Sequence, residues 1–100
     1  DLGEALRLAM LAKSQYPDDP NISDTLGLIH YKNGSYSLAL RQFKQAADKM
    51  PAAAVFKYHA AMALNKLGKT DESKKFLEQA LATGGFQDRA AARELLNSLR

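Results

Sequence analysis

Apolar residues recur through most of this chain at the three- and four-residue spacing of amphipathic helices, and turn residues divide the pattern into six segments. The predicted helices cover residues 2–16, 20–33, 36–50, 52–67, 70–83 and 87–99. The first five are each followed by a proline or glycine that is typical of a helix end, at Pro17, Gly34, Pro51, Gly68 and Gly84. The pattern therefore predicts an all-α fold.

Local signals refine three of these segments. Asp19 before Pro20 predicts a helix start, because an aspartate caps free N–H groups and proline fits the first turn. Ser35 is expected to cap the next helix in the same way. The first segment is apolar on most sides, so we expect it to be buried on more than one side. The last segment is predicted to be a closing helix with Ala91, Leu95 and Leu99 inside and a polar outer face of Arg89, Arg93, Asn97 and Arg100.

The chain repeats itself at an interval of 34 residues. The equivalent pairs include Ala5 and Ala39, Pro17 and Pro51, Gly34 and Gly68, and Ala46 and Ala80. A repeat of this length is the signature of stacked helical hairpins, and such arrays typically bind partners. Within a helix, Gly27 costs about 1 kcal/mol relative to alanine, so it indicates a close approach of a bulky neighbour, and Gly27→Leu is expected to unfold its hairpin.

The repeat resembles the tetratricopeptide repeat (TPR) family, whose unit carries Leu-Gly, an aromatic residue, and then Gly, Tyr, Ala, Phe, Ala and Pro. The matching residues are Leu26, Gly27, Gly34, Tyr36, Ala39, Phe43, Ala46 and Pro51, with His30 at a usual aromatic position. A second unit is degenerate, with Ala60, Ala61, Thr70, Ser73 and Gly85 replacing family residues. The resemblance implies a right-handed superhelix of helix-turn-helix hairpins. It divides the chain into 1–17 (second helix of a truncated repeat), 20–51 (repeat), 54–85 (degenerate repeat) and 87–100 (capping helix).

A narrower resemblance concerns three stretches, which are Asp24–Gly27, Tyr58–Leu64 and Leu81–Phe86, followed by the Ala-Arg-Glu-Leu-Leu helix. They look like the C-terminal end of bacterial TPR lipoproteins associated with PEP-CTERM/exosortase exopolysaccharide systems. This resemblance implies a periplasmic or outer-membrane-associated protein with many repeats upstream; without it the compartment is unknown or cytoplasmic. The opening at Asp1, without a methionine, is also expected of a fragment.

In the TPR family the first helices of successive hairpins line a concave groove that binds a protein or peptide. Carried over by position, the predicted groove residues are Asp24, Thr25, Leu28, Tyr31 and Lys32 from one repeat and Tyr58, His59, Met62, Asn65 and Lys66 from the next, with Val55 beside them. Aromatic and methionine side chains three or four residues apart suit an adaptable peptide-binding surface. The alternative is that these side chains only pack between hairpins. The family's carboxylate clamp needs Lys and Asn where this chain has Asp24 and Leu28, so we expect no clamp.

Charge and chemistry favour a non-enzymatic binding module. The 14 basic and 11 acidic residues are scattered without a run of like charge, so no nucleic-acid or membrane partner is indicated. The two histidines fall at different repeat positions, and the serines are predicted at caps or solvated faces. We therefore expect no catalytic residue, metal or cofactor. A second reading is a C-terminal structural cap of a longer solenoid in exopolysaccharide or protein-sorting machinery, with binding done upstream.

The first helix yields one further prediction. Without a preceding helix to cover it, its apolar face is expected to associate with a second copy, so we predict a weak homodimer through residues 2–16. A polar substitution such as Leu6→Glu is expected to lower the mass in solution if that side chain lies on the exposed face.

Overall fold

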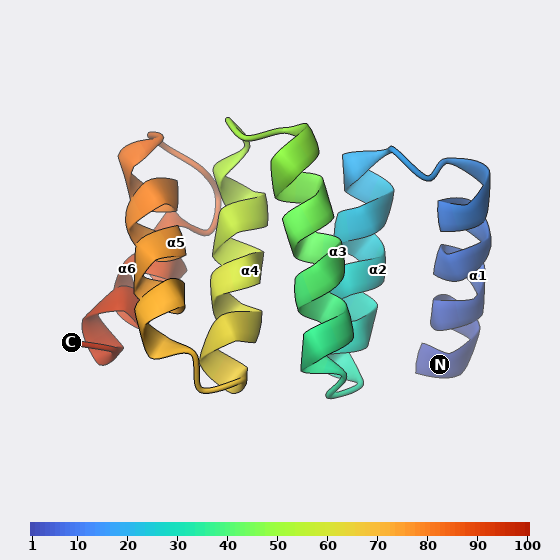
Figure 1. Cartoon of the computed structure of the whole chain (residues 1–100), viewed down its shortest axis with the longest axis horizontal. Helices are drawn as coiled ribbons and strands as arrows, with labels where there is room; N and C mark the ends of the chain where they lie inside the picture. Colours follow the sequence, from blue (N-terminus) through green and yellow to red (C-terminus); the bar gives the residue numbers. More distant parts are fainter.

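The computed structural model describes all residues 1–100 and shows six helices in a row with no strand (Figure 1). The helices are α1 (Leu2–Gln15), α2 (Pro20–Lys32), α3 (Tyr36–Lys49), α4 (Ala54–Lys66), α5 (Thr70–Ala82) and α6 (Arg89–Ser98). The two termini lie at opposite ends of the row (Figure 1). The predicted all-α class with six helices is confirmed.

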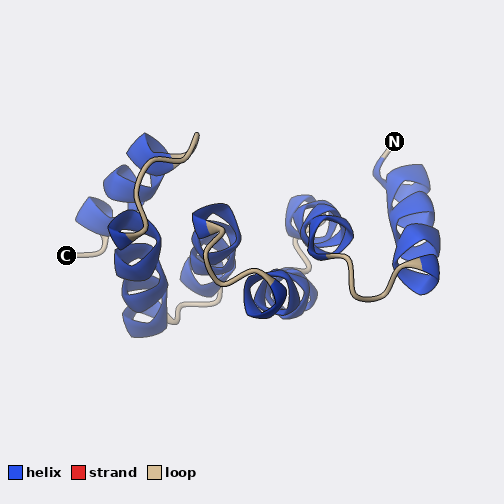
Figure 2. Cartoon of the chain, turned by 90° about the horizontal axis from the view of Figure 1, so that it is seen from above, coloured by secondary structure: helices blue, strands red, loops and turns tan.

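Each helix packs against its neighbours in sequence, and the closest pairs are α2 with α3 and α4 with α5. Seen from above, α2 and α4 lie toward one side of the row and α3 and α5 toward the other (Figure 2). The result is an elongated array with principal extents of 38 × 25 × 19 Å. Such an arrangement leaves one long surface formed by the first helices of the hairpins and another formed by the second helices.

The two hairpin turns have the same backbone geometry. Gly34 and Gly68 adopt positive φ angles of 79° and 75°, which favour glycine because other residues meet a Cβ clash there. The residue after each glycine donates its N–H to a carbonyl five positions back, from Ser35 to His30 and from Lys69 to Leu64. This helix ending satisfies carbonyls that the last turn leaves free. The repeat seen in the sequence is therefore a repeat of backbone conformation.

The predicted helix starts have different outcomes. The Asp19 carboxylate accepts hydrogen bonds from the N–H of Asn21 at 2.9 Å and of Ile22 at 3.4 Å, so this cap is confirmed. The expected Ser35 cap is wrong, because the serine holds the N-cap position but its side chain makes no capping hydrogen bond. At that end the backbone turn through Gly34 connects the two helices without side-chain help.

The core continues from hairpin to hairpin. Its largest cluster joins Ala39, Leu40 and Phe43 of α3 to Ala60, Ala63 and Leu64 of α4. A Cβ placed on Gly27 would lie 2.5 Å from Cε1 of the fully buried Phe43 ring, a distance that real contacts do not reach. The expectation that Gly27 marks a close approach of a bulky neighbour is therefore confirmed.

The two end helices differ from the predictions. Only Ala9 of α1 is buried, because α2 is the one helix that packs extensively against α1, so the expected burial on more than one side is wrong. In α6 the buried residues are Ala92 and Leu96, whereas Ala91 is exposed. Arg89, expected on the wet face, is half-buried and donates from Nη1 to the carbonyl of Leu81 at 2.6 Å and of Gly84 at 3.1 Å.

Candidate functional site

The predicted groove residues come from the adjacent first helices α2 and α4. Thr25, Lys32 and Lys66 are exposed, whereas Leu28, Tyr31, Tyr58, Met62 and Asn65 are half-buried. We call these eight residues the α2–α4 surface. Half-burial keeps a side chain in a defined position while part of it can still contact a partner. Val55 is also half-buried and packs with Ala46, Ala47 and Phe56, which makes it part of the packing between α3 and α4.

Two tyrosines dominate the α2–α4 surface. The Tyr31 ring meets Tyr36 edge to face with centroids 5.2 Å apart, and it packs against the core cluster of α3 and α4. Burial raises the pKa of the Tyr31 hydroxyl above 10.0, with smaller contributions from the Tyr36 and Tyr58 hydroxyls. Burial also raises the pKa of Tyr58, and the nearby carboxylates Asp88 and Glu94 add to the effect. Both hydroxyls therefore stay protonated at neutral pH and can donate and accept hydrogen bonds.

Asp24 and His59 lie beneath this surface and form a bridge between α2 and α4. His59 Nδ1 is 2.7 Å from Asp24 Oδ1, and the two side chains are only 11% and 13% exposed. The His59 ring also contacts Phe43 and Tyr58, with centroid distances of 5.3 and 5.7 Å. These two side chains were predicted as groove residues. In the structure they bond to each other and link the α2–α3 hairpin to the α4–α5 hairpin. Their separation of 35 residues, one repeat plus one, puts them on neighbouring first helices but does not by itself indicate that they pair.

The C-terminal end of the surface is closed by the segment leading into α6. Phe86 packs near Tyr58 with ring centroids 6.4 Å apart, and both rings border the cluster of Ala61, Leu77, Leu81, Ala92 and Leu96. Asp88 and Glu94, whose carboxylates help to raise the pKa of Tyr58, also lie in this region. The sequence carries no signal that connects Phe86 with Tyr58. No helical periodicity links them, since Phe86 follows the glycine-rich turn.

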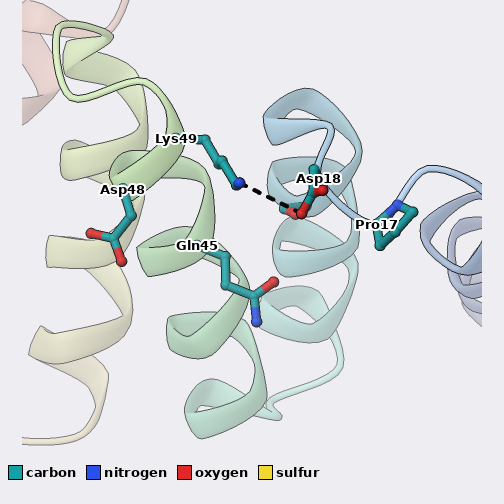
Figure 3. A pocket seen from close by; sticks show the side chains of 6 residues that line it. Pro17, Asp18, Gln45, Asp48 and Lys49 are labelled. Carbon is teal, nitrogen blue, oxygen red and sulfur yellow. Dashed lines mark ion pairs between the residues drawn. The ribbon is translucent and has the colours of Figure 1, made fainter.

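An open cavity of about 330 Å³ lies away from the α2–α4 surface, near the α1–α2 turn and the end of α3 (Figure 3). Apart from Pro17, its lining residues are of polar or charged type, with Ser23, Gln45 and Asp48 beside an ion pair of 3.5 Å between Lys49 and Asp18. Lys13 Nζ donates to three acceptors there: the Pro17 carbonyl at 2.7 Å, Ser23 Oγ at 2.7 Å and Gln45 Oε1 at 2.8 Å. Because an ammonium has three donors, Lys13 is fully used as a brace between α1, α2 and α3.

The remaining polar groups show no catalytic arrangement. No group of three or more His, Asp or Glu side chains is gathered where it can hold a metal ion. Two serines differ from the prediction of caps and solvated faces. Ser73 is fully buried and donates to the Ala61 carbonyl at 2.8 Å, whereas Ser23 is buried under Lys13. Both serines serve the packing between helices. No helix combines the length and the apolar character that a membrane span requires.

Comparisons with known proteins agree with this architecture. Over 49 residues the chain is 41% identical to the TPR repeat-containing protein PA4667 of Pseudomonas aeruginosa. The matched part is 49% of this chain and 8% of that protein, so the chain spans less than a tenth of the relative's length.

Solved structures show the same fold at low sequence identity. The type III secretion translocator chaperone SycD of Yersinia enterocolitica superposes with a TM-score of 0.89 at 18% identity, over 98% of this chain and 71% of that one. PcrH, in complex with the chaperone-binding region of PopD, gives a TM-score of 0.87 at 21% identity, over 98% and 77%. SycD with a peptide of the translocator YopD gives 0.88 at 18% identity, over 98% and 79%.

The family assignment depends on the sequence itself. The sequence model of the tetratricopeptide repeat family matches residues 30–99. This range includes the α2–α3 turn and the whole of α3, α4, α5 and α6. The match thus covers more than half of the chain and agrees with the 34-residue interval, the positive-φ glycines and the six-helix row. The chain belongs to the tetratricopeptide repeat family.

Proposed function

We propose that this chain is a non-enzymatic module that binds a peptide segment of a partner protein on the α2–α4 surface. The observation that carries the proposal is the pair Tyr31 and Tyr58. Both rings are half-buried on neighbouring first helices, and neither hydroxyl bonds to another group of the chain. Leu28 and Met62 add apolar contact area from the same two helices. A hydroxyl held on a fixed ring can bond a peptide backbone at low entropic cost, as tyrosines do at many interfaces.

The comparisons support a peptide ligand. PcrH and SycD have this fold, and their complexes contain the chaperone-binding region of PopD and a peptide of the translocator YopD. Because their sequence identity to this chain is low, they share only its fold. The partner of this chain is therefore proposed from its own surface. Lys32 and Lys66 are exposed at the ends of α2 and α4. We propose that they favour a segment with acidic residues beside its apolar ones.

The test uses a displayed peptide library selected on the wild-type chain, followed by affinity measurements on variants. Tyr31→Phe and Tyr58→Phe remove only the hydroxyls, and the pair together is expected to weaken selected peptides by roughly tenfold, about the value of one or two hydrogen bonds. Tyr16→Phe is the matched control, because Tyr16 is 62% exposed at the C-terminal cap of α1, away from the surface. Amide chemical shifts should change in α2 and α4. Equal affinity for the double variant, or shifts confined to α3 and α5, would refute the proposal.

Salt dependence separates a peptide from a nucleic acid. Binding dominated by tyrosine and apolar contacts changes little with added salt, whereas binding to phosphates loses affinity steeply. A selected peptide should therefore keep most of its affinity when the ionic strength is raised. A single-stranded RNA that bound more tightly than any peptide and was released by salt would point to the other class of partner.

A structural cap is the second candidate, and α6 is the observation that favours it. The helix buries Ala92 and Leu96 against the array and exposes Arg93, Glu94, Asn97 and Arg100 to water. Terminal repeats with a polar outer face are what keep solenoids soluble. On this proposal α6 ends a longer array and binding occurs upstream, as in the envelope exopolysaccharide role that the narrower resemblance implies. Failure to select any peptide on the wild-type chain would favour this candidate.

A further inference from the structure

The side chain of Asn33 is not used by the fold. Asn33 is the exposed C-cap of α2, and none of the side-chain hydrogen bonds in the chain involves its amide. The equivalent residue in the next hairpin is Leu67, which has φ −84° and ψ 0° against −80° and −3° for Asn33. The backbone of the turn therefore does not require an asparagine, although it does require the glycine that follows, Gly34, because of its positive φ.

An asparagine followed by a glycine can react with its own backbone. The glycine nitrogen attacks the side-chain Cγ, the C–N bond of the side-chain amide breaks, and ammonia leaves with the proton of the attacking nitrogen. The product is a cyclic succinimide. Water then adds to one of its carbonyl carbons and opens the ring, which yields aspartate or isoaspartate without any oxidant or reductant. Glycine makes the attack easiest because it has no Cβ to obstruct the nitrogen.

The other three asparagines lack these conditions. Asn21, Asn65 and Asn97 lie inside α2, α4 and α6, and each is followed by a residue with a side chain. The next backbone nitrogen is then both held within a helix and obstructed by a Cβ. Asn33 alone combines an exposed position, a place just outside its helix and a following glycine.

We propose that Asn33 is a site of spontaneous deamidation and that the α2–α3 turn controls its rate. The Gly34 N–H donates to the Tyr31 carbonyl at 3.0 Å, and the next N–H, of Ser35, donates to the carbonyl of His30 at 2.9 Å. At its ψ of −3°, Asn33 also turns the Gly34 nitrogen away from Cγ. The turn has to open before the ring can close, and local opening of this kind costs less than global unfolding. Relative to an unstructured peptide, the reaction should be roughly tenfold to a hundredfold slower, which is the value of one or two net hydrogen bonds.

Isoaspartate alters the backbone of the turn. Its chain runs through the former side chain, so the path from the Asn33 Cα to the Gly34 nitrogen becomes one carbon longer. The Ser35 N–H is then displaced from the His30 carbonyl, the bond that closes the α2–α3 hairpin. Loss of about one net hydrogen bond should lower the melting temperature of this product by roughly 4–8 °C. The aspartate product keeps the normal backbone and only adds a charge at the C-terminal end of α2.

The test incubates the folded chain at physiological temperature and slightly alkaline pH. Peptide mapping by mass spectrometry follows the conversion of each asparagine, and methyl transfer by an isoaspartyl methyltransferase counts the isoaspartate. Asn33 should convert before the other three asparagines. A synthetic peptide of residues 30–37, incubated in parallel, should convert roughly tenfold to a hundredfold faster. Asn33→Leu is the matched control, because it copies Leu67 of the next hairpin. This variant should keep the helices and the melting temperature and should form no product at position 33.

Four results would overturn the proposal. Equal conversion at Asn21, Asn65 or Asn97 would show that position 33 is not a distinct site. A folded chain that reacts as fast as the peptide would show that the turn does not control the rate. Absence of product after roughly a hundred half-lives of the peptide would show that the folded chain is not modified, since about half of it should have reacted by then. A purified isoaspartate product that melts like the wild type, when the Asn33→Asp variant does so too, would refute the effect on the turn.

Discussion

Replacing Gly27 with alanine separates two opposite effects of one methyl group. In a helix interior alanine is more favourable than glycine by about 1 kcal/mol, so helix propensity alone predicts a more stable protein. The structure predicts the reverse, because the new Cβ would stand 2.5 Å from Cε1, 2.7 Å from Cδ1 and 3.2 Å from Cζ of Phe43. The sign of the change in stability therefore decides whether Gly27 is a packing requirement.

The size of the loss depends on whether Phe43 can move. Its ring is fully buried among Ala39, Leu40 and residues of α4, and it also contacts His59 at 5.3 Å. Overpacking a closed core typically costs about 1–3 kcal/mol, and the upper part of that range applies to so short a contact. After the gain in helix propensity, the expected net loss is about 1–2 kcal/mol, which lowers the melting temperature by roughly 5–15 °C.

Thermal and urea unfolding followed by circular dichroism measure this loss. Gly3→Ala is the matched control, since Gly3 is exposed in the first turn of α1 and its nearest neighbour would be the flexible Asp1 carboxylate at 3.3 Å. It should be neutral or stabilising. Phe43→Leu removes the ring atoms that clash, so Gly27→Ala should become neutral or stabilising in that background. The favourable coupling between the two substitutions is expected to be about 1–3 kcal/mol.

Either of two results would refute this reasoning. A Gly27→Ala protein more stable than the wild type would show that the helices separate easily and that glycine is not required. An equal loss in the wild-type and Phe43→Leu backgrounds would show that the cost does not arise at the ring.

Two further predictions concern the histidines. Asp24→Ala should destabilise the chain by about 1–3 kcal/mol, because it leaves His59 Nδ1 buried without its partner. In a double-mutant cycle measured by urea unfolding, combining Asp24→Leu with His59→Phe should recover much of the loss. Additive losses would count against the bridge. Burial lowers the pKa of His30 from 6.5, so the folded state gains less from protonation than the unfolded chain does. Stability should therefore be present above pH 6.5 and fall as the pH drops through the lowered value, and His30→Gln should flatten this part of the pH profile. An unchanged profile in His30→Gln would assign the dependence to other groups.

The helices were largely predictable because their signals are local. Pro17, Pro51 and the turn glycines each act on the backbone where they stand, and the helix ends fall within about two residues of the expected positions. Gly27 was informative because a glycine inside a helix is unfavourable unless a neighbour requires it. α6 was harder. Its buried side centres on Ala92 and Leu96, with Leu95 and Leu99 half-buried and Ala91 exposed.

The candidate site was less predictable because it depends on pairs between helices. The register placed Tyr31 and Tyr58 on neighbouring first helices, but it did not reveal that His59 turns inward to Asp24. The role of Lys13 was equally hard to predict. The equivalent residues in α3 and α5 are Ala47 and Leu81, which are apolar and buried. A polar group at a core position needs partners, and those partners lie up to 32 residues away. Only the folded chain brings them together.

The position of the Asp24–His59 bridge ties the proposed binding surface to the core. His59 contacts Phe43 on its inner side and Tyr58 on its outer side, and Tyr58 in turn contacts Phe86 before α6. A change at Asp24 therefore reaches the Tyr58 ring through a single buried side chain. For this reason an Asp24 variant that loses peptide affinity does not identify Asp24 as a peptide contact. The hydroxyl deletions Tyr31→Phe and Tyr58→Phe avoid this ambiguity. They leave the rings, the bridge and the packing of α2 on α4 in place, so a loss of peptide affinity in these variants identifies the hydroxyls as peptide contacts.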